Sequence, residues 1–255
     1  MKYFSLQNKN ILVTGGGSGI GLALVKSFVQ EGAKVILADI ENCEKLAKSI
    51  GATYVFMDVS KESSVRDGFE TSVDKIGKID VLINNAGISL LSGVLEEGDA
   101  AKWSKVFDIN VFGVMYGLKY GPRYMNQGGS IINTASQAAF TKVAGMEPYA
   151  ASKAAVISLT KTAALELAHQ RIRVNAVCPS NTKTPMMAQS EDAAYAELMS
   201  NLFSPMSRVA ETDDLVGVFH FLASEAAQYI NGQALIVDGG WTAGVSNQLL
   251  EKIQE

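Results

Sequence analysis

Two side chains that could exchange a proton lie four residues apart in an alanine-rich stretch. Tyr149 and Lys153 bound the sequence Tyr-Ala-Ala-Ser-Lys, and residues four apart lie on one face of a helix. A phenol normally titrates at about pH 10, but a cation within a few ångströms favours the phenolate and lowers the pKa. Tyr149 could therefore give or take a proton near neutral pH. Because the same spacing is common on surface helices, this interpretation depends on the rest of the chain.

A glycine-rich turn follows an apolar run near the start of the chain. Residues 10–14 read Asn-Ile-Leu-Val-Thr and are followed by Gly-Gly-Gly-Ser-Gly-Ile-Gly. Between a strand and a helix, such a turn presents backbone N–H groups and a positive helix end to a pyrophosphate. The spacing is T-G-x-x-x-G-x-G, which is neither G-x-G-x-x-G nor a P-loop, because Leu22 stands where the P-loop lysine would follow. The expected dinucleotide contacts are Gly15, Ser18, Gly19, Ile20 and Gly21.

Asp39 ends the next apolar run, 18 residues beyond the last glycine of the turn. An acid at this place accepts hydrogen bonds from the adenosine ribose hydroxyls and repels a 2′-phosphate. Neither Ser18 nor Ile40 brings a positive charge to offset that repulsion. NAD(H) is therefore expected in preference to NADP(H), unless Asp39 only caps the following helix. The expected adenine contacts are Asp58 and Val59, which follow the third apolar run.

Strand and helix patterns alternate along the chain. Strands are expected at 10–14, 34–39, 53–57, 78–84, 129–134, 171–178 and 234–237, and helices at 18–32, 41–50, 60–76, 99–125, 147–168 and 213–224. This alternation implies right-handed crossovers and a parallel sheet covered on both faces. We predict a doubly wound, seven-stranded parallel sheet of Rossmann-like α/β type. The 255 residues, 47% of them hydrophobic, show no break in composition, so one domain over 1–255 is expected.

The stretch 184–208 interrupts this alternation with two prolines, four methionines and a weakly helical run at 191–202. It follows the carboxyl end of a strand, where ligands bind in open α/β sheets. We expect it to cover a bound substrate, although its methionines could instead fill gaps in the core. The side chains expected to form an apolar pocket are Met186, Met187, Leu198, Met199, Leu202, Phe203 and Met206.

Composition argues against several classes of partner. The formal charge is −4, with 22 basic residues scattered among 26 acidic ones, so nucleic acid is not an expected partner. Cys43 and Cys178 are the two cysteines and His169 and His220 the two histidines, which leaves no pair at metal-ligand spacing. The polar first ten residues, and the lack of any apolar run of about 20 residues, favour a cytoplasmic protein that does not enter a membrane.

With these motifs in view, nearly the whole chain closely resembles the short-chain dehydrogenase/reductase family. Beyond the glycine turn and the Tyr149–Lys153 pair, it contains Asn84-Asn-Ala-Gly87, then Asn110, Ser136 and Asp238-Gly-Gly240 in that order. Ser136 lies 13 residues before Tyr149, which fits the family. The resemblance implies an NAD(H)-dependent oxidoreductase that interconverts a secondary alcohol and a ketone by hydride transfer.

The resemblance also implies roles for the matching residues. Tyr149 would exchange the proton with the substrate oxygen, and Ser136 would hydrogen-bond that oxygen. Lys153 would lower the pKa of Tyr149 and bind the nicotinamide ribose, while Asn110 would anchor a water that links Lys153 to solvent. The further expected cofactor contacts are Asn85, Ala86, Gly87, Pro179, Thr182 and Thr184.

One segment departs from the family pattern. After the sixth strand the chain reads Cys178-Pro-Ser-Asn-Thr-Lys-Thr184, so Ser180 replaces the usual glycine and Thr182 a branched aliphatic residue, whereas Thr184 matches. This places the detailed geometry around the nicotinamide in question. Neither replacement adds a charge or a large group, so cofactor binding is still expected.

The family resemblance favours a homotetramer. Small residues on two helices would allow close packing between chains: Gly113, Gly117, Ala154, Ala155, Ala163 and Ala164. The short amphipathic tail 245–255 is either a further interface element or disordered. Two alternative functions stay open: a 3-oxoacyl-thioester reductase, which usually prefers NADPH, and a non-catalytic nucleotide-binding protein of the same fold.

Overall fold

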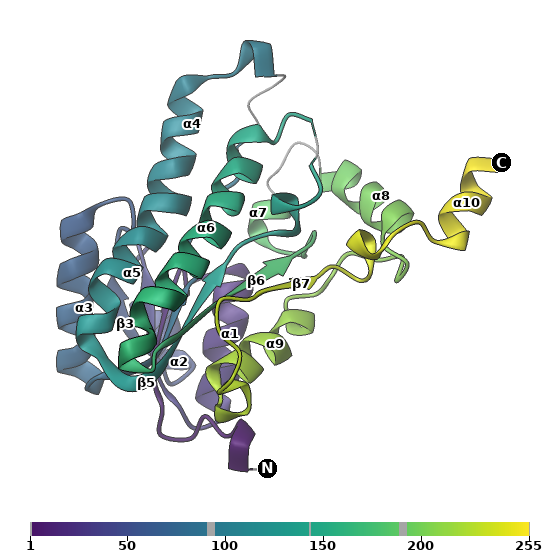
Figure 1. Cartoon of the computed structure of the whole chain (residues 1–255). Coiled ribbons are helices and arrows are strands. Elements are labelled where there is room, and N and C mark those ends of the chain that lie inside the picture. Colours follow the sequence, from purple (N-terminus) through teal and green to yellow (C-terminus); the bar gives the residue numbers. More distant parts are fainter. Residues whose placement is uncertain (1, 91–94, 143, 189–192, 255) are drawn as a thin grey trace.

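Seven parallel strands form one sheet at the centre of the molecule (Figure 1). The computed structural model describes residues 2–90, 95–142, 144–188 and 193–254. The strands, in chain order, are β1 (Asn10–Thr14), β2 (Lys34–Asp39), β3 (Thr53–Phe56), β4 (Ile79–Asn84), β5 (Met125–Thr134), β6 (Arg173–Pro179) and β7 (Ala234–Val237). Their order across the sheet is β3-β2-β1-β4-β5-β6-β7. The order reverses between β1 and β4, and ligands of such sheets bind beyond the carboxyl ends of the strands at this point.

Helices cover both faces of the sheet, as the sequence predicts. The helices are α1 (Gly19–Gln30), α2 (Glu44–Ser49), α3 (Glu62–Ile76), α4 (Ala100–Phe107), α5 (Gly113–Tyr124), α6 (Glu147–Glu166), α7 (Pro185–Ala188), α8 (Ala193–Phe203), α9 (Asp213–Ala223) and α10 (Asn247–Gln254). Side chains of α1, α2 and α9 pack into one apolar cluster, and those of α3, α5 and α6 into another (Figure 1). The predicted doubly wound α/β fold is confirmed.

The two clusters arise from the alternation of side chains along the strands. In β1, Ile11 and Val13 belong to the cluster under α1 and α9, whereas Leu12 belongs to the cluster under α3 and α5. Successive side chains of a strand point to opposite faces, and both faces of this sheet are covered. The central strands therefore read as unbroken apolar runs, which is why they stand out in the sequence.

The single helix expected over 99–125 is three segments in the structure. A π-helical turn, Asp108–Phe112, separates α4 from α5. A π turn adds a residue to the repeat without ending the helix, and such turns are frequent at functional sites. The π turn could not be predicted from the sequence, because the apolar spacing continues on both sides. Strand β5 also begins at Met125, earlier than the expected 129.

Four of the small residues expected at an interface face the interior instead. A Cβ placed on Gly117 would lie 2.2 Å from Asn84 Oδ1, and one on Gly113 would lie 3.0 Å from Val59 Cβ. Ala163 and Ala164 are buried in the cluster under α3, α5 and α6. The interpretation that these residues form an outer face is therefore wrong. They bring helices close to the sheet.

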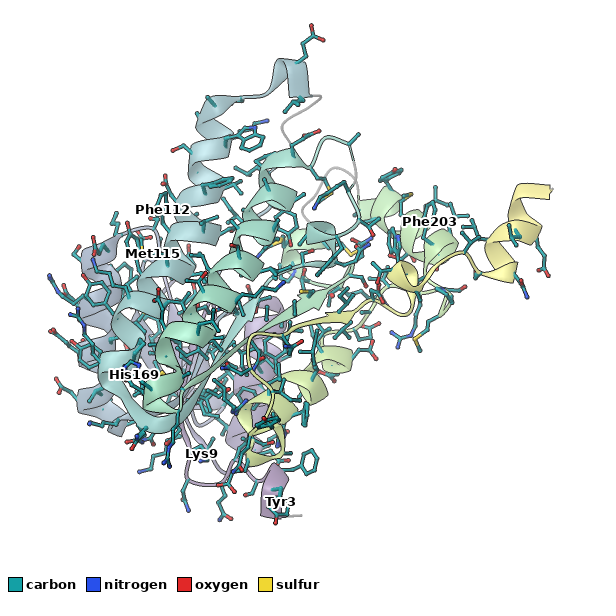
Figure 2. The ribbon with its side chains drawn as sticks, viewed as in Figure 1. Tyr3, Lys9, Phe112, Met115, His169 and Phe203 are labelled. Carbon is teal, nitrogen blue, oxygen red and sulfur yellow. The ribbon has the colours of Figure 1, made fainter. Side chains whose placement is uncertain are left out.

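The stretch 184–208 contains α7 and α8, which follow the carboxyl end of β6 (Figure 1). The expected helix began at 191, and residues 191 and 192 lie outside the described part of the chain. Phe203, at the end of α8 (Figure 2), stacks on Trp241 with ring centroids 5.5 Å apart. Beyond this contact α10 projects from the body (Figure 1). Among the described helices, none is long and apolar enough to cross a membrane.

Candidate active site

The glycine turn between β1 and α1 has no room for side chains. Gly15 has a φ of +62°, and a Cβ there would lie 2.8 Å from the Ala86 Cα. A Cβ on Gly21 would lie 2.0 Å from the Gly15 carbonyl oxygen. Glycine is therefore required for the turn to close on itself and on the segment after β4. The N-terminus of α1 is left facing the carboxyl edge of the sheet, as the sequence predicts.

Thr14 and Asn85 fasten this turn to the segment after β4. The Thr14 hydroxyl accepts hydrogen bonds from the backbone N–H groups of Asn85 (3.0 Å) and Ala86 (3.1 Å). The Asn85 side-chain amide donates to the carbonyls of Thr14 (3.1 Å) and Gly15 (3.2 Å). The expected cofactor contacts on these two segments are thus neighbours in the structure. Thr14 was not among the predicted site residues, although it is the first letter of the turn motif.

The Asp39 carboxylate contacts the same turn from the end of β2. Its Oδ2 accepts from the Gly17 N–H at 2.9 Å, and its Oδ1 accepts from the Glu41 N–H at 3.1 Å. A Cβ on Gly17 would lie 2.6 Å from Cys43 Sγ and 2.9 Å from Asp39 Oδ2, so a side chain there would displace both groups. Asp39 is therefore both a candidate ribose ligand and a support for the turn. A carboxylate has about four lone pairs, so acceptor capacity for ribose hydroxyls is left.

Asp58, after β3, is buried with a local set of donors. Its Oδ1 accepts from the Ser60 N–H (3.0 Å) and the Ser60 hydroxyl (2.6 Å), and Lys61 forms an ion pair with Oδ2 at 3.2 Å. Burial acts to raise the pKa of Asp58, but the hydrogen bonds from Ser60 and Lys61 outweigh it and lower the pKa. The carboxylate is thus held ionised, as an acceptor for an adenine amino group must be. Val59 packs against Gly113.

Asn110 lies in the π-helical turn and is fully buried. Its Oδ1 accepts from the Ile88 N–H at 2.8 Å, and its Nδ2 donates to the Ile88 carbonyl at 2.9 Å and to the Ser152 hydroxyl at 3.1 Å. A Cβ placed on Gly87 would lie 3.1 Å from Asn110 Oδ1 and 3.4 Å from Lys153 Nζ. The π turn therefore brings Asn110 to the lysine of α6.

Lys153 is a buried ammonium, only 4% exposed. Its Nζ donates to the Thr134 carbonyl at 2.8 Å and lies 5.6 Å from the centroid of the Tyr149 ring. Burial lowers the pKa of Lys153 to about 8. The amine thus sits beside the phenol, as the spacing predicts, close to its own titration point at neutral pH.

Tyr149 and Ser136 form the other half of this cluster. Ser136 is buried, and its Oγ accepts from the Ala138 N–H at 3.1 Å and donates to the Pro179 carbonyl at 3.4 Å. Burial raises the pKa of the Tyr149 phenol, and the hydrogen bond with Ser136 lowers it in part. The expected lowering of this pKa by Lys153 is not found. Burial outweighs the hydrogen bond with Ser136, and the Lys153 Nζ lies 5.6 Å from the centroid of the ring.

The segment after β6 lies between the glycine turn and the serine. A Cβ on Gly19 would lie 3.2 Å from Thr184 Cγ2, so Thr184 borders the glycine turn, and its contact with the cofactor stays a prediction. The Thr182 hydroxyl donates to the Ser180 carbonyl at 2.9 Å, so its side chain is used within the segment. Ser180 donates its backbone N–H to the Val237 carbonyl at 3.1 Å, which continues the sheet without the usual glycine.

A family model described as enoyl-(acyl carrier protein) reductase matches residues 15–242, which covers the turn, the Tyr149–Lys153 pair and the final glycines. The chain belongs to the short-chain dehydrogenase/reductase family. Family members are oxidoreductases that use nicotinamide cofactors. The glycine turn fits such a dinucleotide, because a Cβ on Gly15 or Gly21 would collide with backbone and the N-terminus of α1 is left open.

Similar proteins span the same length. Borneol dehydrogenase, mitochondrial, from Lavandula x intermedia is 38% identical over 240 residues, which cover 92% of this chain and 91% of that protein. The NADP-dependent (R)-specific alcohol dehydrogenase of Lentilactobacillus kefiri is 38% identical over 252 residues (93% and 98%). A 3-oxoacyl-(acyl-carrier-protein) reductase of Thermotoga maritima is 39% identical over 248 residues (92% and 98%).

Solved structures of the family superpose closely. A short-chain type dehydrogenase/reductase from Mycobacterium marinum has a TM-score of 0.89 at 30% identity, covering 95% of this chain and 99% of that one. Levodione reductase has a TM-score of 0.88 at 32% identity, covering 93% and 99%. The sequence-based assignment to the short-chain dehydrogenase/reductases is confirmed.

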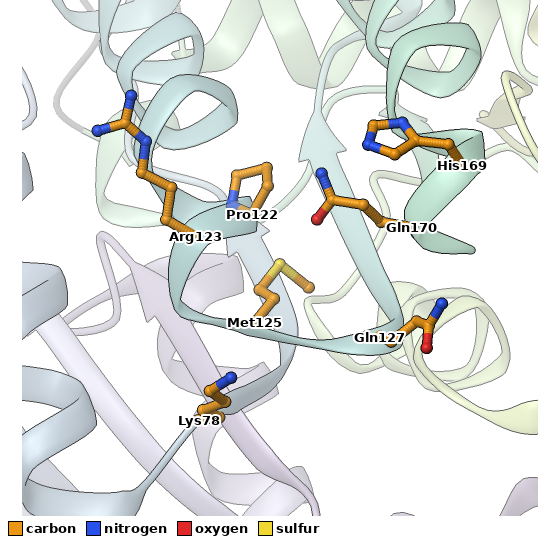
Figure 3. Close-up of a pocket in the computed structure, with 7 residues that line it drawn as sticks. All are labelled: Lys78, Pro122, Arg123, Met125, Gln127, His169 and Gln170. Carbon is orange, nitrogen blue, oxygen red and sulfur yellow. The ribbon is translucent and has the colours of Figure 1, made fainter.

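Away from this site, a hollow of about 520 Å³ opens at the amino ends of the strands (Figure 3). It is lined by Lys78, Pro122, Arg123, Met125, Gln127, His169 and Gln170. Arg123 stands in the last turn of α5, and His169 follows the end of α6. Basic side chains at helix C-termini complement the helix dipole. Their positions here are therefore explained without a ligand.

Proposed function

We propose that this short-chain dehydrogenase/reductase interconverts a secondary alcohol and a ketone with NAD(H). The observation that supports this most is the convergence of Ser136, Tyr149, Lys153 and Asn110 beside the glycine turn. Asn110 and Lys153 both lie within 3.4 Å of the Cβ position of Gly87, and Ser136 hydrogen-bonds Tyr149. A protein that only bound a nucleotide would need the turn but not these four residues.

The proposed NAD(H) preference is based on Asp39. Its carboxylate is fixed beside the turn by Gly17 and Glu41, where it would accept from ribose hydroxyls and repel a 2′-phosphate. The Lentilactobacillus relative is named as NADP-dependent, so the preference varies within the family. In this chain, the neighbouring Ser18 and Ile40 offer no cation to a phosphate.

The residues present can carry out the proton transfer of ketone reduction. A nicotinamide held at the glycine turn would supply the hydride for the carbonyl carbon. Tyr149 gives its phenolic proton to the carbonyl oxygen, and the Ser136 hydroxyl stabilises the charge that develops on that oxygen. Lys153, with a pKa of about 8, can return a proton toward the phenolate. Alcohol oxidation runs through the same residues in reverse.

The raised pKa of Tyr149 favours the protonated phenol that ketone reduction requires. For alcohol oxidation the phenolate is needed, and an oxidised nicotinamide carries a positive charge that would favour it. Ketone reduction would thus start from the neutral phenol of Tyr149, and alcohol oxidation from its phenolate.

A panel of secondary alcohols and ketones, assayed by NADH and NADPH absorbance, tests this proposal. Activity with NAD(H) is expected, and Tyr149→Phe should reduce kcat by roughly 10²–10⁴-fold while leaving NADH affinity nearly unchanged. Tyr54→Phe, a half-buried tyrosine whose hydroxyl donates to the Asp39 carbonyl, is the matched control for loss of a phenol and should keep kcat. If Tyr149→Phe retained most of the rate, the assigned role would be wrong.

A 3-oxoacyl-thioester reductase is the second candidate, because the Thermotoga relative carries that name. The two functions differ in the substrate and not in the mechanism. Comparing a 3-oxoacyl thioester with simple apolar ketones at equal concentration decides between them. We favour the simple ketone, because Asp39 disfavours NADPH. The methionine-rich stretch 184–208 is proposed to cover such an apolar substrate.

We also propose the homotetramer that the family resemblance implies. Two exposed apolar side chains support it, since Leu165 of α6 is 79% exposed and Phe112, in the π turn before α5, is 44% exposed. Cytoplasmic residence stays a prediction of the sequence, and the Lavandula relative is named as mitochondrial.

A further inference from the structure

The side chain of Asn181 joins helix α8 to residues 179–184, the segment at the end of β6 that is called the strip below. Its side-chain Nδ2 donates to the Ala196 carbonyl at 2.9 Å and to the Ser200 hydroxyl at 3.1 Å. A carbonyl oxygen can only accept, so the amide nitrogen must face the helix. The two acceptor atoms belong to residues one turn apart on α8. The amide group has two hydrogens, one for each acceptor.

The helix side of this contact is ordered by its own hydrogen bonds. Ser200 is 2% exposed, and its hydroxyl donates to the Ala196 carbonyl at 2.8 Å. The Ser200 carbonyl accepts from the Ser204 N–H at 3.1 Å, and the Ser204 hydroxyl donates to the Gly239 carbonyl at 3.0 Å. The C-terminal end of α8 is therefore also attached to the segment after β7, through Ser204 and Gly239.

The strip side of the contact touches the candidate active site. The Pro179 carbonyl accepts from Ser136 Oγ at 3.4 Å, and Thr184 packs on Gly19 of the glycine turn. Between these points, the Asn181 carbonyl accepts from the Ala210 N–H at 3.1 Å, which pins the strip to the segment after α8. Asn181 is thus the side chain through which the strip beside Ser136 holds α8.

We propose that Asn181 is a positioning residue that fixes α8 over the substrate relative to Ser136 and the cofactor turn. The inference deepens the proposed function and depends on it for the substrate. Because α8 carries apolar side chains proposed to face the substrate, its position sets substrate affinity. The proton transfer itself does not use Asn181.

The test is Asn181→Leu, a replacement of similar size that cannot donate. Hydrogen–deuterium exchange of the unliganded protein should become roughly tenfold faster across residues 193–203, because two hydrogen bonds are lost, while exchange at 14–21 stays unchanged. For the best ketone of the panel, KM should rise about tenfold and kcat should change less than threefold, with the same pH profile and NADH affinity.

Asn126→Leu is the matched control. Asn126 is a partly buried asparagine whose Nδ2 donates to Asp80 at 2.8 Å, at the amino edge of the sheet. It should change neither KM nor exchange in α8. Ser200→Ala removes one of the two acceptors and should give a smaller rise in KM than Asn181→Leu.

Three results would overturn the proposal. The first is an exchange rate in α8 that Asn181→Leu leaves unchanged. The second is a KM that rises no more than in Asn126→Leu. The third is a KM that rises together with an equal loss of NADH affinity, which indicates a general structural role. The exchange measurement needs no activity, so failure of the proposed function is distinguishable from failure of the contact itself.

Discussion

Lys153 shows how the fold sets the charge of a single residue. The ammonium is 4% exposed and donates a hydrogen bond to the neutral Thr134 carbonyl, and burial lowers its pKa to about 8 from an ordinary value of 10.5. Buried cations without a carboxylate partner reduce stability and are retained where chemistry uses them. In the proposed mechanism, Lys153 is therefore a group that lowers stability in return for function.

This trade predicts a pH-dependent stability difference. Between pH 8 and 10.5 the unfolded chain holds the Lys153 proton and the folded chain releases it, so the stability of the wild type rises with pH in this window. Lys153→Met should raise Tm by a few degrees at pH 7, and this advantage should shrink above pH 8. Thermal unfolding at several pH values measures it. The control is Lys161→Met, on the exposed side of α6, whose Tm relative to the wild type should not change with pH in this way. If the gain in Tm of Lys153→Met were the same at every pH, the prediction would be wrong.

Asp39 allows a prediction about cofactor choice. Asp39→Ala should weaken NADH binding by roughly tenfold, because a charged acceptor is lost, and should narrow the preference for NADH over NADPH. Fluorescence titration with both cofactors measures the ratio. Glu41→Ala removes an exposed acid two residues away and serves as the control, which should keep the ratio. An unchanged ratio in Asp39→Ala would reject Asp39 as the selecting residue.

The strands and the helices that cover the sheet could be predicted from the sequence, whereas the irregular turns within them could not. Strand β1 has the bounds that the sequence predicts, because an apolar run ended by glycine has a single interpretation. The π turn at Asp108–Phe112 escaped prediction because it changes the repeat over one turn only. The contact of Asn181 with α8 escaped it as well, since side-chain hydrogen bonds between distant elements leave no periodic pattern.

The role of Asn110, which lies in the π turn, can be tested by substitution. Asn110→Leu would leave the N–H and carbonyl of Ile88 without these partners in the interior, at a cost of about 1–3 kcal/mol for each group. Tm should fall by several degrees and kcat should fall with it, because Lys153 loses its neighbour. Asn126→Leu should lower Tm less and keep kcat. If Asn110→Leu and Asn126→Leu changed kcat equally, the prediction that the π turn has a specific part in catalysis would be wrong.

For the whole molecule, composition and alternation were enough to predict the architecture. An all-parallel sheet needs helical crossovers, and the alternation of patterns supplies them in the right order. The faces of the helices were harder to predict. Glycine is needed at 113 and 117 because Val59 and Asn84 lie against these positions. From the sequence alone, this need cannot be distinguished from a need for small residues at a contact between chains.

The proposed homotetramer predicts a mass in solution of about four times the chain mass of 27.2 kDa. Size-exclusion chromatography with light scattering measures it. Leu165→Glu places a charge at an apolar position of α6 that is 79% exposed, and it should shift the protein to smaller species. Ile40→Glu, a charge at an exposed site away from α5 and α6, should keep the mass. A wild type that runs as a monomer would contradict the expectation.

If Asp39 both supports the glycine turn and binds the ribose, as proposed, a consequence follows for the evolution and engineering of this enzyme. A mutation that abolishes the acid also takes the acceptor away from the Gly17 amide, so the loop would lose order before a phosphate-binding arginine could arise. Asparagine keeps an oxygen at the same place without the charge. A lineage that switches coenzyme is therefore expected to pass through the amide first, and a laboratory library that omits it would miss the least damaging route.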